Sequence, residues 1–211
     1  NIKKWLKFGI PVSIWSSLGM LLHFLDRFFI DKFCDLFELG VYSSISELLI
    51  RAFSFLIFPF TMALHPRITN LWNSKKKLES IQLIDRSLVI LFIFLTLTLF
   101  VVLFFNSIIF KGLIYIIPEL PSSSKDLIAP LIFTGIFWQL SFLTHKMIEL
   151  NEKTYIMIIF ILVSVVINLI GNIYFLPLNG IIATAYASLF SSLSYCILTS
   201  LYYIKEKSKI I

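Results

Sequence analysis

The sequence predicts an all-α membrane protein, a polytopic bundle with six transmembrane helices. Its 211 residues are 58% hydrophobic and only 14% charged, and the mean hydropathy is +0.92. A soluble domain of this length needs a much more polar surface. The apolar runs are longer than about 20 residues and do not alternate with polar positions, which favours spanning helices over the strands of a barrel.

Six apolar spans follow one another along the chain. They lie at about residues 8–33, 40–64, 87–110, 127–148, 154–176 and 180–204. No linker, repeat or low-complexity tract divides them, so we expect residues 1–211 to form one helical unit. Because the chain begins with Asn1 and not Met, we expect it to be part of a longer protein.

The basic residues predict the orientation of the spans. If the N-terminus lies inside, thirteen of the 18 Lys and Arg residues fall in inner segments, four lie in outer segments or at their span edges, and one lies within a span. This bias predicts cytoplasmic N- and C-termini, which also requires an even number of spans. The longest inner connection, residues 65–86, is expected to form a short helix on the membrane surface.

The first two spans carry ionisable residues, whereas three of the other spans carry no Asp, Glu, Lys or Arg. His23, Asp26 and Arg27 lie in the first span, and Glu47 and Arg51 lie in the second. Charges at membrane depth are costly, so they pair or face a cavity. Glu47 and Arg51 can pair at i, i+4 spacing, and Asp26 is expected at the depth of Glu47. These residues either line a polar cavity for a charged substrate or coupling ion, or form a structural salt bridge. His23 is as compatible with a packing role as with proton transfer.

The last two spans carry polar and small residues at every fourth position. In the fifth span, Ser164, Asn168 and Asn172 form one stripe beside Gly171. Their amides must face protein or water, because lipid offers them no hydrogen-bond partner. The sixth span has a ridge of small residues that permits close helix contact. This ridge consists of Gly180, Thr184, Ser188 and Ser192.

Composition and motifs argue against several other functions. The net charge is +6. In a membrane protein, we expect the basic residues to lie in cytoplasmic loops and to contact anionic lipids, so nucleic-acid binding is not expected. We find no H-E-x-x-H, P-loop or G-x-S-x-G motif, so an enzyme is not expected. The two cysteines are far apart in the sequence, and neither a metal site nor a cofactor is predicted.

Two segments resemble a known family. Residues 25–44 contain Asp26-Arg27 followed by Gly40-Val41-Tyr42, and residues 151–192 combine a Thr, a helix with Asn, a Pro, a Gly-Ile pair and an Ala-rich helix. Both segments are similar to polysaccharide flippases, the O-antigen and exopolysaccharide repeat-unit exporters. The matching residues of the second segment are Thr154, Asn168, Pro177, Gly180, Ala183, Ala185 and Ala187.

The resemblance implies the C-terminal six-helix lobe of a two-lobe MATE-like transporter in the bacterial inner membrane, with the N-terminal lobe missing. The implied substrate is an undecaprenyl-diphosphate-linked oligosaccharide. Arg27 or Arg51 would meet the diphosphate, and Asp26 or Glu47 would bind a coupling proton or sodium ion; Asn168 and Asn172 are further candidates for the cavity. The alternatives are a cation-coupled multidrug or small-molecule exporter of the same fold, a membrane enzyme of envelope biosynthesis, and a non-transporting scaffold fragment.

Overall fold

The computed structural model is helical throughout its ordered elements. It describes residues 2–211, and the side chains of all of these except 2–5, 53 and 56. No strand occurs in this part of the chain, so the all-α prediction is confirmed. The elements are α1 (Ile2–Phe33), α2 (Leu36–Asn73), α3 (Lys77–Ile116), the short 3-10 helix η1 (Ser122–Leu127), α4 (Ile128–Thr144), α5 (Lys146–Leu150), α6 (Tyr155–Asn179) and α7 (Ile181–Lys207).

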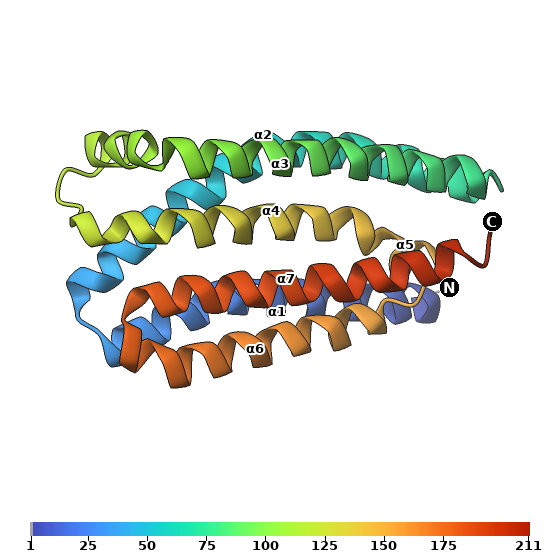
Figure 1. Cartoon of the computed structure of the whole chain (residues 1–211). Coiled ribbons are helices and arrows are strands. Elements are labelled where there is room, and N and C mark those ends of the chain that lie inside the picture. The colour runs from blue at the N-terminus through green and yellow to red at the C-terminus, as the bar shows by residue number, and fades with distance from the viewer. Residues whose placement is uncertain (1) are drawn as a thin grey trace.

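These helices have the length and apolar composition of membrane spans. Among the described residues, five helical segments can each cross a bilayer, and the two halves of α2 together make a sixth. Successive long helices run in opposite directions, so both termini lie at one end of the bundle (Figure 1). We call this the terminal end, and the opposite end, which carries the α1–α2 and α6–α7 turns, the distal end. The protein is therefore a multi-pass membrane protein.

Helix α2 is bent in its middle. Its halves, Leu36–Ala52 and Ile57–Asn73, meet at 47°. Pro59 lies just beyond the break and has no N–H to donate to the carbonyl four residues earlier. This agrees with the kink that a proline inside a span predicts. Helix α3 has a second irregularity at Phe105, where φ is −117° and ψ is 15°.

The prediction of a short surface helix over residues 65–86 is wrong. Helices α2 and α3 extend through this segment and leave only a short turn between them. Their apolar faces continue to pack there: Ile68, Ile81 and Ile84 are fully buried in one cluster. The Ser80 hydroxyl donates a hydrogen bond to the carbonyl of Ile68 at 3.0 Å. Arg67, Asn70 and Arg86 are exposed, whereas Ser80 is fully buried between the two helices.

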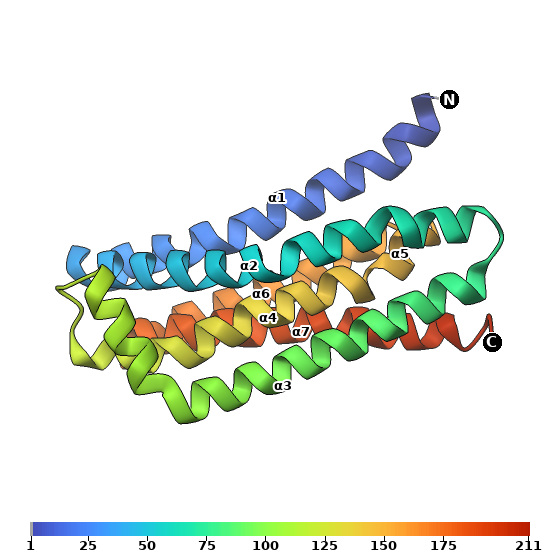
Figure 2. The same ribbon diagram turned by 90° about the horizontal axis from the view of Figure 1, so that it is seen from above.

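The closest packing in the bundle is between α6 and α7. A Cβ added to Gly171 would lie 2.5 Å from the Cβ of Ala187, so only glycine fits there. Small residues therefore bring the last two helices together at this point, although neither Gly171 nor Ala187 belongs to the predicted ridge. Helix α7 also packs on α4, α1 packs on α6, and α2 packs on α4. Helices α1 and α2 lie side by side at the distal end but diverge towards the terminal end (Figure 2).

The Gly171 contact predicts a stability difference between two glycine substitutions. Gly171→Ala forces α6 and α7 apart and should lower the free energy of unfolding by about 1–3 kcal/mol, the usual cost of overpacking. Gly112→Ala is the matched control, because a Cβ on Gly112 meets nothing within 4 Å and alanine favours a helix. Thermal unfolding in detergent measures both; equal melting temperatures would contradict the close contact.

Candidate functional site

The carboxylate of Asp26 lies at the centre of a polar site near the distal end of the bundle. Asp26 is 4% exposed. Tyr42 Oη donates to Asp26 Oδ2 at 2.9 Å, and Asn168 Nδ2 and Asn172 Nδ2 donate to Asp26 Oδ1 at 2.9 and 3.1 Å. The Ser188 hydroxyl also donates to Asp26 Oδ2. Four neutral donors from three other helices therefore hold one acidic group.

The helical spacing seen in the sequence explains how these groups meet. Ser164, Asn168 and Asn172 occupy one face of α6, and all three are fully buried. That face packs on α7, where Ser191 donates to the backbone carbonyl of Ser164 at 2.9 Å. Helix α1 packs on the same part of α6 and places Asp26 opposite the two amides. The predicted site residues Asp26, Asn168 and Asn172 are thus brought together.

The Asp26 site contains an oxygen atom that has no partner. Asn172 Oδ1 is buried and accepts no hydrogen bond from the described residues. A cavity of about 20 Å³ lies against Asp26, Tyr42 and Ser188, which is room for one water-sized occupant. A carboxylate surrounded by amide and hydroxyl oxygens suits a small hard cation. Rotation of an amide by 180° exchanges its nitrogen for its oxygen, so the same residues can face either a carboxylate or a cation.

The other predicted charges form a separate chain of ion pairs. Glu47 accepts from Arg27 at 2.9 Å and from Arg51 at 2.5 Å. The side chains of Arg27, Glu47 and Arg51 are 40%, 42% and 77% exposed, respectively. The predicted pairing of Glu47 with Arg51 is confirmed. The expectation that these charges form one buried cluster with Asp26 is wrong, because Asp26 points to α6 and α7 whereas the ion-pair chain is exposed on the face of α1 and α2.

His23 takes no part in either group. It is exposed and forms no hydrogen bond or ion pair with the residues whose side chains are described. It does border the small cavity beside Asp26. Its position one turn from Asp26 on α1 accounts for this proximity without giving it a contact to the carboxylate.

A second buried polar cluster, which the sequence did not indicate, lies at the terminal end. Lys146 and His145 are 4% and 3% exposed. Lys146 pairs with Glu149, and its Nζ lies 2.6 Å from His65 Nε2 on α2. His145 Nε2 lies 3.2 Å from Glu149 Oε1, and its Nδ1 shares a hydrogen bond of 3.3 Å with Tyr195 on α7. These contacts join α2, α5 and α7.

This terminal cluster faces a large cavity between the diverging ends of α1 and α2. The cavity has a volume of about 700 Å³, within the range of small-molecule sites. Both apolar and hydrogen-bonding side chains line it. The lining residues are Phe8, Gly9 and Val12 of α1, His65, Thr69, Trp72 and Asn73 of α2, and Lys146, Glu149, Leu150 and Glu152.

One sequence signal could have indicated the terminal cluster. His145, Lys146 and Glu149 are spaced so that both basic residues reach the same carboxylate within one helical turn. The charge pattern alone placed Lys146 among ordinary inner-surface lysines. The partners His65 and Tyr195 come from distant parts of the chain, so local spacing gives no indication of them.

Comparison with protein-family models, curated proteins and solved structures finds no match to this chain. The functional argument therefore depends on the site residues themselves.

The terminal cluster predicts an unequal effect of two lysine substitutions. Lys146→Met leaves the carboxylate of Glu149 buried without its cation and should lower the free energy of unfolding by about 3–5 kcal/mol. Lys209→Met removes an ion pair to Glu206 at the surface, where the lysine side chain is 55% exposed, and should change stability by less than about 1 kcal/mol. Thermal unfolding compares the two.

A double variant separates lost charge from lost packing. Lys146→Met combined with Glu149→Gln removes both charges, so most of the lost stability should return. If Lys146→Met and Lys209→Met are equally mild, Lys146 is not in a buried ion pair.

Proposed function

We propose that this protein is one lobe of a membrane transporter that flips a lipid-linked oligosaccharide carrying a diphosphate. The observation that carries the proposal is the open ion-pair chain of Arg27, Glu47 and Arg51, exposed within membrane-spanning helices. Exposure of such charges to hydrocarbon is costly. The face of α1 and α2 therefore requires a water-filled cavity, a second protein lobe, or both.

The charge balance of this face favours an anionic substrate. Two guanidinium groups share one carboxylate, so the chain Arg27–Glu47–Arg51 carries one excess positive charge. Planar guanidinium groups bind phosphate oxygens through paired hydrogen bonds. A diphosphate entering the cavity would compete with Glu47 for Arg51, the more exposed of the two arginines. The resemblance to polysaccharide flippases supports an oligosaccharide on that diphosphate.

Alternating access fits the arrangement of α1 and α2. Their divergence opens a separate cavity, not lined by Arg27 or Arg51, at the terminal end, which the basic residues of the sequence predict to be cytoplasmic. Transporters of this type expose a cavity to either side by rocking two lobes. The proposal therefore includes a preceding lobe and a location in the bacterial inner membrane with both termini in the cytoplasm.

The Asp26 site supports coupling to a cation. Its carboxylate, amide and hydroxyl oxygens and its small cavity fit sodium, and the carboxylate alone fits a proton. A cation-coupled exporter of the same fold would use the same site. The two transport functions differ in substrate, and the open arginines favour the anionic one.

Complementation of a flippase-null strain by the full-length protein tests the proposed transport. Arg27→Ala and Arg51→Ala should each reduce surface polysaccharide at least severalfold, because the diphosphate loses a cationic partner. Arg86→Ala, outside this face, is the control and should retain wild-type polysaccharide. Normal polysaccharide in both Arg27→Ala and Arg51→Ala, at equal expression, would overturn the proposed role of this face.

Cation binding at Asp26 is tested by thermal stability. A ligand that binds only the folded protein at 100 times its dissociation constant adds about 2.7 kcal/mol, so sodium chloride should raise the melting temperature relative to choline chloride at equal concentration. Asp26→Asn should abolish this difference. A sodium effect that is the same in the variant would place the cation elsewhere, and a pH effect without a sodium effect would indicate proton coupling.

A further inference from the structure

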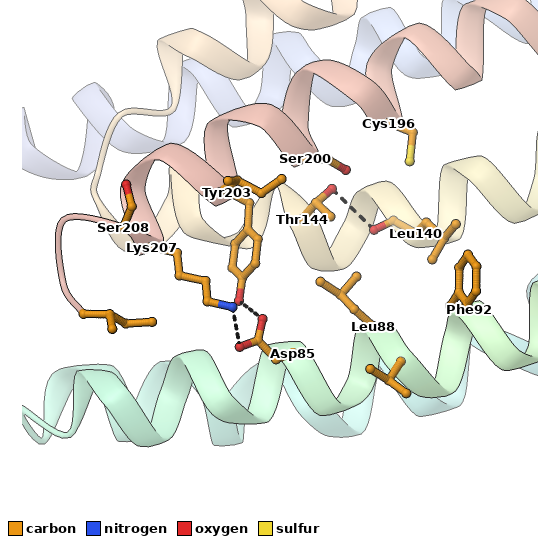
Figure 3. Close-up of a pocket in the computed structure, with 13 residues that line it drawn as sticks. Asp85, Leu88, Phe92, Leu140, Thr144, Cys196, Ser200, Tyr203, Lys207 and Ser208 are labelled. Atoms are coloured by element: carbon orange, nitrogen blue, oxygen red, sulfur yellow. Dashed lines mark hydrogen bonds and ion pairs between the residues drawn. The ribbon is translucent and has the colours of Figure 1, made fainter.

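A groove lies between α3 and α7. These two helices are on the side of the bundle away from α1 (Figure 2). The volume of the groove is about 780 Å³. Helix α4 forms the floor through Leu140 and Thr144. The walls are mostly apolar and come from Leu88, Val89 and Phe92 of α3 and from Cys196, Ser200 and Ile204 of α7 (Figure 3).

The groove is open to the lipid-facing surface. Val89, Phe92 and Ile204 on its rims are 58%, 64% and 60% exposed. Ile93 and Leu201, which adjoin the rims, are also strongly exposed. In a membrane protein, an apolar groove with apolar rims is in contact with lipid chains. No side chain of the described residues fills its centre.

The terminal end of the groove is polar. Lys207 Nζ lies 2.8 Å from Asp85 Oδ2, and Tyr203 donates to Asp85 Oδ1 at 2.8 Å (Figure 3). The ammonium group of Lys207 has three donors, and Asp85 uses one of them. Asp85 and Lys207 are the charged residues that line the groove, so the remaining donors of the Lys207 ammonium group are available to an anion there.

The length of the groove matches one leaflet of a bilayer. Its α7 wall runs from Cys196 to Ser208, which is about 18 Å at 1.5 Å per residue. One leaflet contributes about half of the ~30 Å hydrocarbon core. A chain that begins at Lys207 and follows the groove would therefore end near the middle of the membrane.

We propose that this groove binds one acyl chain of an anionic glycerophospholipid, with the lipid phosphate at Lys207 and Ser208. The apolar walls fit the chain, the free donors of the Lys207 ammonium group fit the phosphate, and the length fits a lipid of the leaflet at the terminal end. A bound lipid would fill the space between α3 and α7 and join two helices that otherwise contact each other little. This site does not depend on the identity of the transported substrate.

Native mass spectrometry of the delipidated full-length protein tests the site. Phosphatidylglycerol should bind first and at least about fivefold more tightly than phosphatidylcholine with the same chains. Ser200→Trp fills the groove and should reduce this binding by at least fivefold. Leu201→Trp is the matched control, because Leu201 is 59% exposed and does not line the groove; it should bind like the wild type. Lys207→Gln should remove the preference for the anionic lipid.

A photoreactive phosphatidylglycerol with a diazirine in its acyl chain tests the wild-type protein directly, which covers the case in which Ser200→Trp fails to fold. Crosslinks should concentrate in the peptides that contain Leu88–Phe92 and Cys196–Ile204. Crosslinks spread evenly over other lipid-facing helices, equal binding by the two tryptophan variants, or tighter binding of undecaprenyl phosphate than of phosphatidylglycerol would each overturn the proposal.

Discussion

The arrangement of the bundle depends on the need to solvate one carboxylate inside a membrane. Asp26 has no cation among the described residues in contact with it, so neutral donors must replace its water. They come from α2, α6 and α7, and each of these helices must therefore lie within hydrogen-bond distance of α1. Loss of any one helix position would leave a buried charge partly unsatisfied. The site therefore fixes helix register where apolar packing alone would permit sliding.

The same constraint explains the small residues of α6 and α7. Two asparagines and a serine can reach one carboxylate only if their helices approach closely. The Gly171–Ala187 contact provides that approach, because Gly171 directly precedes Asn172 and Ala187 directly precedes Ser188. Apolar packing between lipid-embedded helices has little hydrophobic driving force, because lipid tails are equally apolar. Polar contacts and close backbone approach therefore contribute more to specificity here than they would in a soluble bundle.

Much of the fold could be predicted from the sequence, because long apolar runs determine the number and approximate position of the spans. Spacing also identified the polar faces, so Asp26, Asn168 and Asn172 were found without coordinates. Spacing does not reveal which helix a face contacts. Tyr42 was noted only for its place in a motif, and Ser188 only as part of a packing ridge, yet both donate to Asp26. The terminal cluster was missed for the same reason, since His65 and Tyr195 reach Lys146 and His145 across 81 and 50 residues of sequence.

The two polar clusters act on opposite ends of α2. At the distal end, Tyr42 and Glu47 attach α2 to Asp26 and Arg27 of α1. At the terminal end, His65 attaches α2 to Lys146 of α5, and α1 has diverged from α2 (Figure 2). The bend near Pro59 lies between these attachments, so the two halves of α2 have different neighbours. The angle between the halves can change at this bend. A cation that replaced Tyr42 at Asp26 would loosen the distal attachment alone. In the proposed transporter, this is how the occupancy of a small site near one membrane face could alter a cavity near the other.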